Sequence, residues 1–304
     1  MAAQRDLRDW FLFIFLSLLW ASAYAMTRGA VFGAHGLPPL LVIPGRLVIG
    51  AIILNIVIVA TGKRYPPFSD LRLWAMMAGM GFLGMTGPFF LIAVAQQNVD
   101  SSLAALYVAA APIFVVAGAN FMFEDEKLNS RIALGIGVGF IGVMTLFGPE
   151  VFQSFGSTNA TAHILLLTGA MFYAASTLLA RTAPKMEPLV FASGFVTLAA
   201  LISLPMLLIV DWKTVSPSTT QFLSVVGLGA GPSALASLLY MMVVQRSGAT
   251  FLALTGYLVP VLSAVIGFLI FREVQSWNAL LAFALILSGV WLAQRPARPK
   301  NPAI

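Results

Sequence analysis

The chain has 304 residues, of which 60% are hydrophobic and only 9% are charged. Soluble domains carry about 25% charged residues, so this composition excludes a soluble globular protein and predicts a polytopic membrane protein. The formal net charge of +6 does not indicate nucleic-acid binding, because the basic residues are spread over separate segments. Cysteine is absent, which excludes disulfide bonds, thiol catalysis and cysteine metal sites.

Ten apolar runs follow one another along the chain, each long enough to cross about 30 Å of hydrocarbon as a helix. Their connections are short and leave no room for a soluble domain. We therefore expect an all-α membrane protein with ten transmembrane helices. The runs cover residues 11–32, 38–61, 72–96, 101–123, 130–147, 161–180, 188–210, 221–244, 249–271 and 276–293.

The first apolar run has two interpretations. Arg5 and Arg8 precede residues 11–28, and small residues end that stretch, as in a secretory signal peptide with its cleavage site. The alternative is a first membrane helix that stays in the protein. With ten helices and a cytoplasmic N-terminus, 13 of the 17 Lys and Arg fall in inner segments and three in outer segments. This positive-inside bias predicts a retained helix and two cytoplasmic termini.

An internal repeat supports the ten-helix count. Residues 101–126 resemble residues 249–273, since each segment has a tyrosine, a mid-helix proline (Pro112 or Pro260) and an acidic residue at its end. Residues 18–28 also align with residues 171–181, which pairs Trp20 with Tyr173.

Five helices per half is an odd number, so the two halves are expected to have opposite orientations in the membrane, as in many transporters. The expected units are two inverted five-helix repeats, residues 10–148 and 160–294, followed by a cytoplasmic tail, residues 295–304.

Several of these motifs together resemble a known family. A tryptophan followed by small residues in helix one, an arginine in helix two, and tyrosine, proline and a following acid in helices four and nine are similar to the ten-helix exporters of the drug/metabolite transporter superfamily (the EamA domain). Within it, the chain resembles bacterial aromatic amino acid exporters of the YddG type. The resemblance covers nearly the whole chain, although its motifs are loose.

This resemblance implies an exporter in the bacterial inner membrane that works by alternating access on small metabolites. Amino acids with aromatic or other apolar side chains are the expected substrates, and another neutral metabolite or a drug is the alternative. The expected partners are this small molecule and membrane lipid, without nucleic acid, and a monomer is compatible with the sequence. A channel is less favoured, because no charged ring or carbonyl filter is recognisable.

Other motifs do not indicate enzyme chemistry. Residues 79–84 and 137–142 match the dinucleotide-binding fingerprint, but both lie inside apolar spans without a preceding strand. There glycine lets helices approach closely, as Gly135 and Gly139 also would. No cofactor is therefore expected.

The titratable residues are equally uninformative about catalysis. His35 and His163 are expected to be solvated boundary residues rather than metal ligands. All eleven Asp and Glu fall at or beyond helix ends, whereas proton relays and sites for cationic drugs need an ionisable group at depth. The sequence predicts no catalytic residue, no metal site and a neutral or zwitterionic, partly apolar substrate.

Aromatic residues at depth are the candidates for the transport path. Trp20 lies about 14 Å into helix one, whereas the other tryptophans lie near span ends. It either packs in the core or lines a substrate cavity, together with Tyr24 one turn further on. The hydroxyls of Tyr107 and Tyr257 need partners, either in the cavity or in helix-to-helix hydrogen bonds. The full set of candidate substrate-binding residues is Trp20, Tyr24, Arg46, Phe90, Tyr107, Tyr173, Tyr240 and Tyr257.

Prolines inside the spans remove backbone donors and kink the helices. They are expected to act as hinges, to expose carbonyls to the substrate, or to be tolerated kinks. The hinge candidates are Gly87, Pro88, Pro112, Gly231, Pro232 and Pro260.

Arg46 is the one charge inside a span, about 12 Å deep. Such a charge costs at least about 2.5 kcal/mol unless it has a partner or reaches water. It either snorkels to the headgroups or pairs with helix-end carbonyls, or it faces the central cavity to hold a substrate carboxylate or an outer gate. The repeat-related position is Phe195, so folding symmetry does not require the charge.

Overall fold

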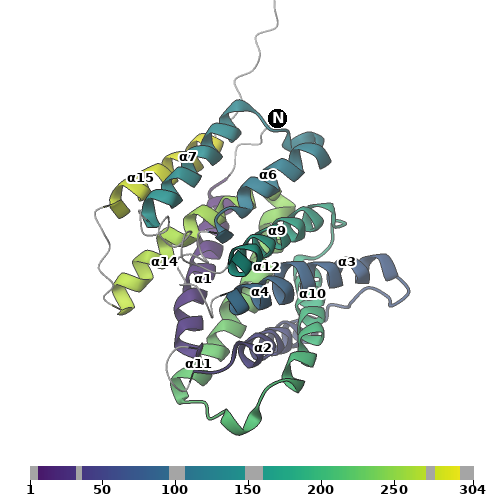
Figure 1. Ribbon diagram of the computed structural model, residues 1–304. Coiled ribbons are helices and arrows are strands. Elements are labelled where there is room, and N and C mark those ends of the chain that lie inside the picture. The colour runs from purple at the N-terminus through teal and green to yellow at the C-terminus, as the bar shows by residue number, and fades with distance from the viewer. Residues whose placement is uncertain (1–5, 32–35, 96–106, 148–159, 272–277, 295–304) are drawn as a thin grey trace, which may run out of the picture.

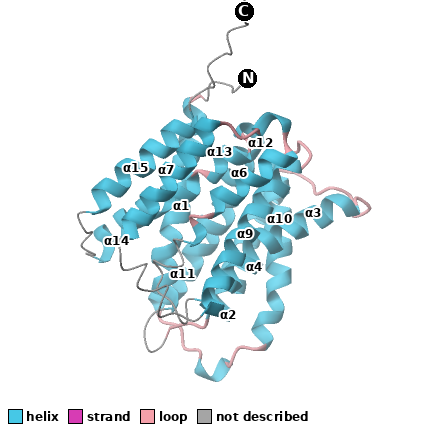
Figure 2. Cartoon of the chain, turned by 45° about the horizontal axis from the view of Figure 1, so that its top comes forward, coloured by secondary structure: helices cyan, strands magenta, loops and turns pink. Residues whose placement is uncertain are grey.

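The computed structural model describes residues 6–31, 36–95, 107–147, 160–271 and 278–294 (Figure 1). These residues form helices joined by loops, without a strand among them (Figure 2). Six helical stretches are long and apolar enough to cross a membrane, and four shorter apolar helices occupy the remaining expected spans. This confirms the all-α, ten-helix membrane fold.

The helices of the first half are α1 (Leu7–Val31), α2 (Pro39–Ala60), α3 (Leu71–Gly81), η1 (Phe82–Thr86), α4 (Gly87–Ala95), α6 (Ala111–Met122), η2 (Glu124–Glu126) and α7 (Ser130–Phe147). Those of the second half are α9 (Ala160–Thr182), α10 (Pro188–Ser203), η3 (Leu204–Leu208), η4 (Trp212–Thr214), α11 (Thr219–Leu228), η5 (Gly229–Leu235), α12 (Ala236–Ser247), α13 (Ala249–Ala253), α14 (Thr255–Phe271) and α15 (Asn278–Gln294).

Helix α1 is built into the bundle. Leu12, Phe13 and Leu16 are at most 5% exposed, and the helix contacts α11, α12 and α14. On its other face Leu7 and Phe11 are exposed, as lipid-facing residues are. This packing supports the structural helix over the signal-peptide alternative.

Glycines bring α7 and α15 together at one side of the bundle (Figure 1). A Cβ added to Gly135 would lie 2.7 Å from the Gly289 carbonyl oxygen, and one added to Gly289 would lie 2.5 Å from the Gly139 nitrogen. The backbones therefore touch where any larger residue would separate them. The predicted role of Gly135 and Gly139 in close helix approach is confirmed.

The third and eighth spans each contain a π-helical segment at their middle. Segment η1 closes with the Gly87 amide donating to the Phe82 carbonyl, and η5 closes with the Ala236 amide donating to the Gly231 carbonyl. Both bonds reach back five residues instead of four. Pro232 lies inside η5, and Gly87 and Pro88 are the first two residues after η1. The Gly-Pro pairs thus coincide with helix irregularities, which proteins often place at functional sites.

The fourth and ninth spans are interrupted rather than continuous. Pro112 stands in the first turn of α6, after a turn at residues 109–110, so it is not a mid-helix proline as expected. A proline is tolerated there because the first amides of a helix have no intrahelical acceptor. The ninth span breaks at Leu254, between α13 and α14, and Pro260 does lie inside α14.

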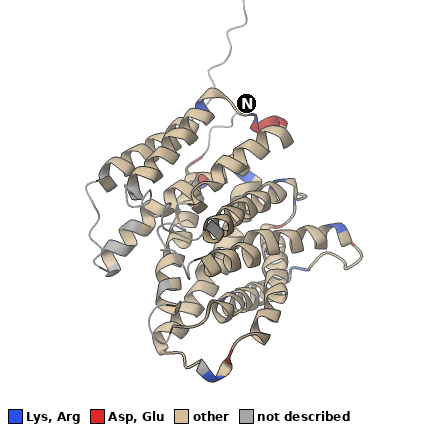
Figure 3. Ribbon diagram, viewed as in Figure 1, with Lys and Arg blue, Asp and Glu red and all other residues tan. Residues whose placement is uncertain are grey.

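Charged residues lie at helix ends and in loops, while the middle of the bundle carries few of them (Figure 3). Ion pairs join helix ends that the positive-inside bias places on the same face of the membrane, the cytoplasmic one. They are Arg246 with Asp9 and Asp6, Lys63 with Glu187, and Arg181 with Glu126 and Asp125.

Candidate functional site

Arg46 is the buried cation of the bundle interior. Its side chain is 8% exposed, and its Nε–H donates to the Ser233 hydroxyl across 3.0 Å. The guanidinium carbon lies 4.3 Å from the centroid of the Phe89 ring, a distance typical of a cation–π contact. Among the described residues no carboxylate forms an ion pair with it. The side chain is therefore held in the interior by neutral partners, and does not snorkel.

Tyr173 lies next to this cation, and Tyr24 lies next to Tyr173. Tyr173 on α9 interacts electrostatically with Arg46 on α2 and with Tyr24 on α1. Both tyrosines keep part of their surface accessible. The phenol oxygen of Tyr173 therefore lies near the guanidinium, and that of Tyr24 lies near Tyr173. Both hydroxyls can accept or donate hydrogen bonds.

A second group of rings continues the site. The ring centroids of Trp20 and Tyr240 are 6.1 Å apart, and those of Phe195 and Tyr240 are 6.4 Å apart. The Tyr240 hydroxyl lies near the side chains of Ser176 and Thr177 on α9. Tyr240 thus links α1, α9, α10 and α12.

We call these residues the central aromatic cluster. It draws side chains from both halves of the chain. Its members are Trp20, Tyr24, Arg46, Phe89, Tyr173, Phe195, Ser233 and Tyr240.

Five of the eight predicted substrate-binding residues meet in this cluster: Trp20, Tyr24, Arg46, Tyr173 and Tyr240. Their contact with substrate stays a prediction.

Phe90 lies outside the cluster, in contrast to the expectation. Its side chain is 38% exposed, and the preceding residue, Phe89, contacts Arg46 instead. The reason lies in η1, because a π-helical turn contains an extra residue and rotates everything after it by about 100°. The sequence does not reveal this segment.

Tyr107 and Tyr257 also lie apart from the cluster and satisfy their hydroxyls by helix-to-helix hydrogen bonds, the second of the two predicted alternatives. Tyr257 is fully buried and donates to the Ile136 carbonyl across 3.2 Å. The Tyr107 hydroxyl is 2.7 Å from Nδ1 of His163. His163 is accordingly half-buried and bonded rather than solvated, and His35 lies outside the described residues.

Phe89, Phe195 and Ser233 are cluster members that the sequence alone did not identify as site residues. The repeat relation between Arg46 and Phe195 was a usable signal, since both positions line the same interior. A close approach of α2 and η5 brings Ser233 to Arg46: a Cβ on Gly50 would lie 3.1 Å from the Ser233 Cβ. No sequence pattern indicated that approach.

Ten membrane-spanning helices around an interior that holds the Arg46 cation, hydroxyls and aromatic rings from both halves define a polytopic membrane transporter. The chain belongs to the EamA-like transporter family, whose model matches residues 9–148 and 160–294. The transporter class is thus established, and with it a small-molecule substrate and a lipid environment.

Three known proteins illustrate the similarity. An uncharacterized inner membrane transporter of Escherichia coli K12, YedA, is 26% identical over 93% of this chain and 91% of its own. A probable terminal-alkyne amino-acid exporter of Streptantibioticus cattleyicolor is 28% identical over 91% of this chain and 90% of its own. A crystal structure with 22% identity superposes with a TM-score of 0.77 over 95% of this chain and 97% of that one, which shows the shared fold.

Proposed function

We propose that this transporter exports amino acids with aromatic or other apolar side chains. The main support for this proposal is the environment of Arg46. Its guanidinium is buried and has only neutral partners among the described residues. A buried cation without a counterion is costly, and a carboxylate that enters beside it forms a short, strong, charge-assisted hydrogen bond. The substrate carboxylate takes this position, and the apolar part of the substrate contacts Trp20 and Tyr240.

The chemistry of the cluster supports this substrate class. Aromatic rings offer apolar contact area with a preferred geometry for a second ring. The hydroxyls of Tyr24 and Tyr173 orient a polar group, as the few polar side chains of ligand pockets do. The similarity to a probable amino-acid exporter supports the same class.

Alternating access between two inverted halves, residues 10–148 and 160–294, is the proposed mode of transport. Cluster residues come from both halves, so relative movement of the halves changes the access to the site. The π-helical segments η1 and η5, with their Gly-Pro pairs, and the breaks before Pro112 and Pro260 are the proposed places where the helices bend.

We further propose a bacterial inner-membrane location with both termini in the cytoplasm. The charge bias of the sequence supports this orientation. The ion pairs that join helix ends on one face agree with it. The E. coli relative is named an inner membrane transporter, which agrees with the location.

The test uses purified protein in liposomes with two labelled compounds, phenylalanine and its decarboxylated analogue phenethylamine. Arg46→Gln is expected to raise the half-saturation concentration of phenylalanine about tenfold to hundredfold, and that of phenethylamine much less, because only phenylalanine carries the carboxylate. Arg72→Gln removes an exposed arginine outside the cluster and is the matched control.

An equal loss for both compounds, or wild-type transport of phenylalanine by Arg46→Gln, would remove Arg46 from the substrate site. Uptake that saturates and exchanges with unlabelled substrate identifies a carrier. Flux that rises linearly with concentration would instead identify a channel and contradict alternating access.

A further inference from the structure

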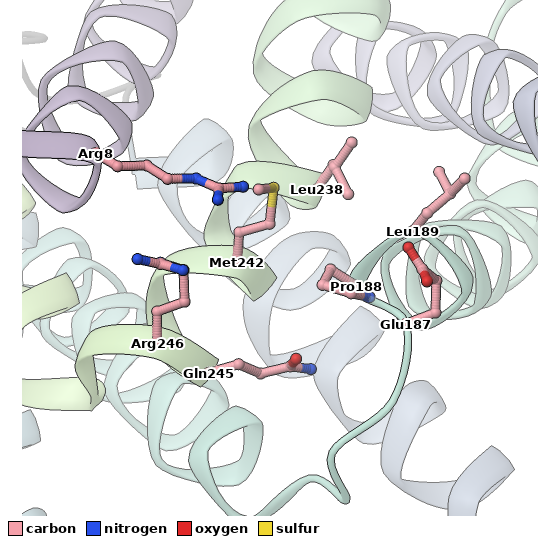
Figure 4. Close-up of a pocket in the computed structure, with 8 residues that line it drawn as sticks. All are labelled: Arg8, Glu187, Pro188, Leu189, Leu238, Met242, Gln245 and Arg246. Carbon is pink, nitrogen blue, oxygen red and sulfur yellow. The ribbon is translucent and has the colours of Figure 1, made fainter.

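A pocket of about 430 Å³ lies at one end of the bundle, between the first residues of α1, the first residues of α10 and the end of α12. In Figure 4 the side chains of Arg8 and Arg246 lie on one side of it, and Glu187, Pro188 and Leu189 on the other. Leu238, Met242 and Gln245 of α12 complete the lining.

This pocket is separate from the central aromatic cluster. Tyr240 faces the cluster, and Leu238 and Met242 are two residues to either side of it. Two residues correspond to about 200° of helix rotation, so both lie on the opposite face of α12. Leu235, on the same face one turn earlier, is 37% exposed. The pocket therefore opens along the outer, lipid-facing surface of the bundle.

The charges of the lining are compensated except at Arg8. Glu187 pairs with Lys63 at 2.5 Å, and Arg246 pairs with Asp9 at 2.9 Å. Arg8 has no hydrogen-bond or ion-pair partner among the described residues, and it shares its side of the pocket with Arg246, whereas Glu187 lies on the other side (Figure 4).

A second polar group of the pocket also lacks a partner. The amide nitrogen of Gln245 is buried without an acceptor in the part of the chain that the structure describes. The atom has no accessible surface, so a ligand in the pocket does not reach it while the side chain keeps this position. The polar contact that the pocket offers to an oxygen-rich, singly charged group is therefore Arg8.

We infer that this pocket binds a phospholipid from the adjacent leaflet, with the phosphodiester at Arg8 and the acyl chains along Leu238 and Met242. The arrangement has the three features that such a ligand needs: a cation at the level of the headgroups, an apolar wall that runs toward the middle of the membrane, and an opening toward lipid. Basic pockets between transmembrane helices bind phospholipid headgroups in this way. Only one charge is uncompensated, so a phosphodiester fits better than a polyanion.

The experiment measures thermal unfolding of the full-length protein in detergent with three additives: dioleoylphosphatidylglycerol, dioleoylglycerol and inorganic phosphate. The phospholipid is expected to raise the midpoint temperature with saturation, and the other two are not, because one lacks the phosphate and the other lacks the chains. Arg8→Gln is expected to weaken the apparent affinity about tenfold, as loss of a charge-assisted hydrogen bond does. Arg72→Gln, at an exposed arginine outside the pocket, is expected to leave it unchanged.

A third variant, Leu238→Trp, fills the pocket and keeps every charge, so it is expected to abolish the phospholipid effect while Arg8 is intact. Native mass spectrometry of the same proteins counts the retained lipids independently of stability. Equal stabilisation by dioleoylglycerol, an effect of phosphate alone, or equal effects of Arg8→Gln and Arg72→Gln would each overturn the phospholipid site.

Discussion

The Nε–H of Arg46 on α2 donates to the hydroxyl of Ser233 in η5 across 3.0 Å, although the two residues are 187 positions apart. The bond connects the two halves of the chain at the buried cation. The direction of the guanidinium therefore depends on Ser233, a residue of the other half. Substitution of Ser233 is expected to change substrate binding although Arg46 itself is unchanged.

Ser233→Ala is expected to raise the half-saturation concentration for phenylalanine about threefold to tenfold, in the same direction as Arg46→Gln but by less. A hydrogen bond to a charged group contributes about 1.5–3 kcal/mol, and the free arginine partly re-forms bonds elsewhere. Ser237→Ala is the control, since the Ser237 hydroxyl donates to the Ser233 carbonyl of the same span and not to Arg46. A larger effect of Ser237→Ala than of Ser233→Ala would contradict this role.

Phe89 and Phe90 provide a matched pair of neighbours. Phe89→Leu removes the ring under the Arg46 guanidinium, a contact that contributes about 0.5–2 kcal/mol, and is expected to weaken transport of phenylalanine about twofold to tenfold. Phe90→Leu changes a partly exposed side chain and is expected to be near neutral. Liposome uptake by the two variants measures the difference, and the reverse order of effects would show that Phe90 is the functional ring.

Glu126 joins three helix ends. Its carboxylate accepts from the Ala249 amide at 2.9 Å and the Thr250 amide at 2.7 Å, and it pairs with Arg181. We expect Glu126→Gln to lower the midpoint of thermal unfolding by an amount equivalent to about 1–3 kcal/mol, because the start of α13 loses a charged cap.

The control is Glu124→Gln. The Glu124 side chain is 95% exposed, and among the described residues its ion-pair partner is Lys127. Such surface pairs contribute little, so its midpoint is expected to match that of the unmodified protein. Equal midpoints for both variants would show that the Glu126 cap is not stabilising.

The proposed orientation predicts opposite signals from two reporter fusions. A reporter placed after residue 155 is expected to be active on the outer side, and one after residue 304 on the cytoplasmic side, because the basic residues concentrate in the inner segments. Alkaline phosphatase and fluorescent-protein fusions make the measurement. Signals from the same side would refute the ten-span topology.

Transport is expected to proceed down the substrate gradient without an imposed proton gradient. All eleven Asp and Glu fall at or beyond the helix ends, so the membrane interior offers no carboxylate to carry a proton. Counterflow of labelled phenylalanine in liposomes with equal pH inside and outside tests this. An absolute requirement for a pH gradient, or a proton current that accompanies the substrate, would rule it out.

The sequence by itself determined what depends on position along the chain. Hydrophobic length defined the ten spans, and Arg46 stood out because a single charge inside a span is conspicuous. The repeat identified Trp20 and Tyr173 as related positions, and both belong to the cluster. These properties follow from the cost of placing polar groups in hydrocarbon, which applies to each residue regardless of its neighbours.

Only the tertiary structure decided which side chains face the interior. In a soluble helix the polar face reveals the buried one, but in a membrane both lipid and protein interior are apolar, so Phe89 and Phe90 look alike in sequence. The π-helical segment η1 then rotates the residues that follow it. The face on which they lie therefore cannot be predicted from a period of 3.6 residues per turn. Ser233 reaches Arg46, and Tyr257 reaches Ile136 instead of the cluster, through contacts between distant helices that are set by packing rather than by local pattern.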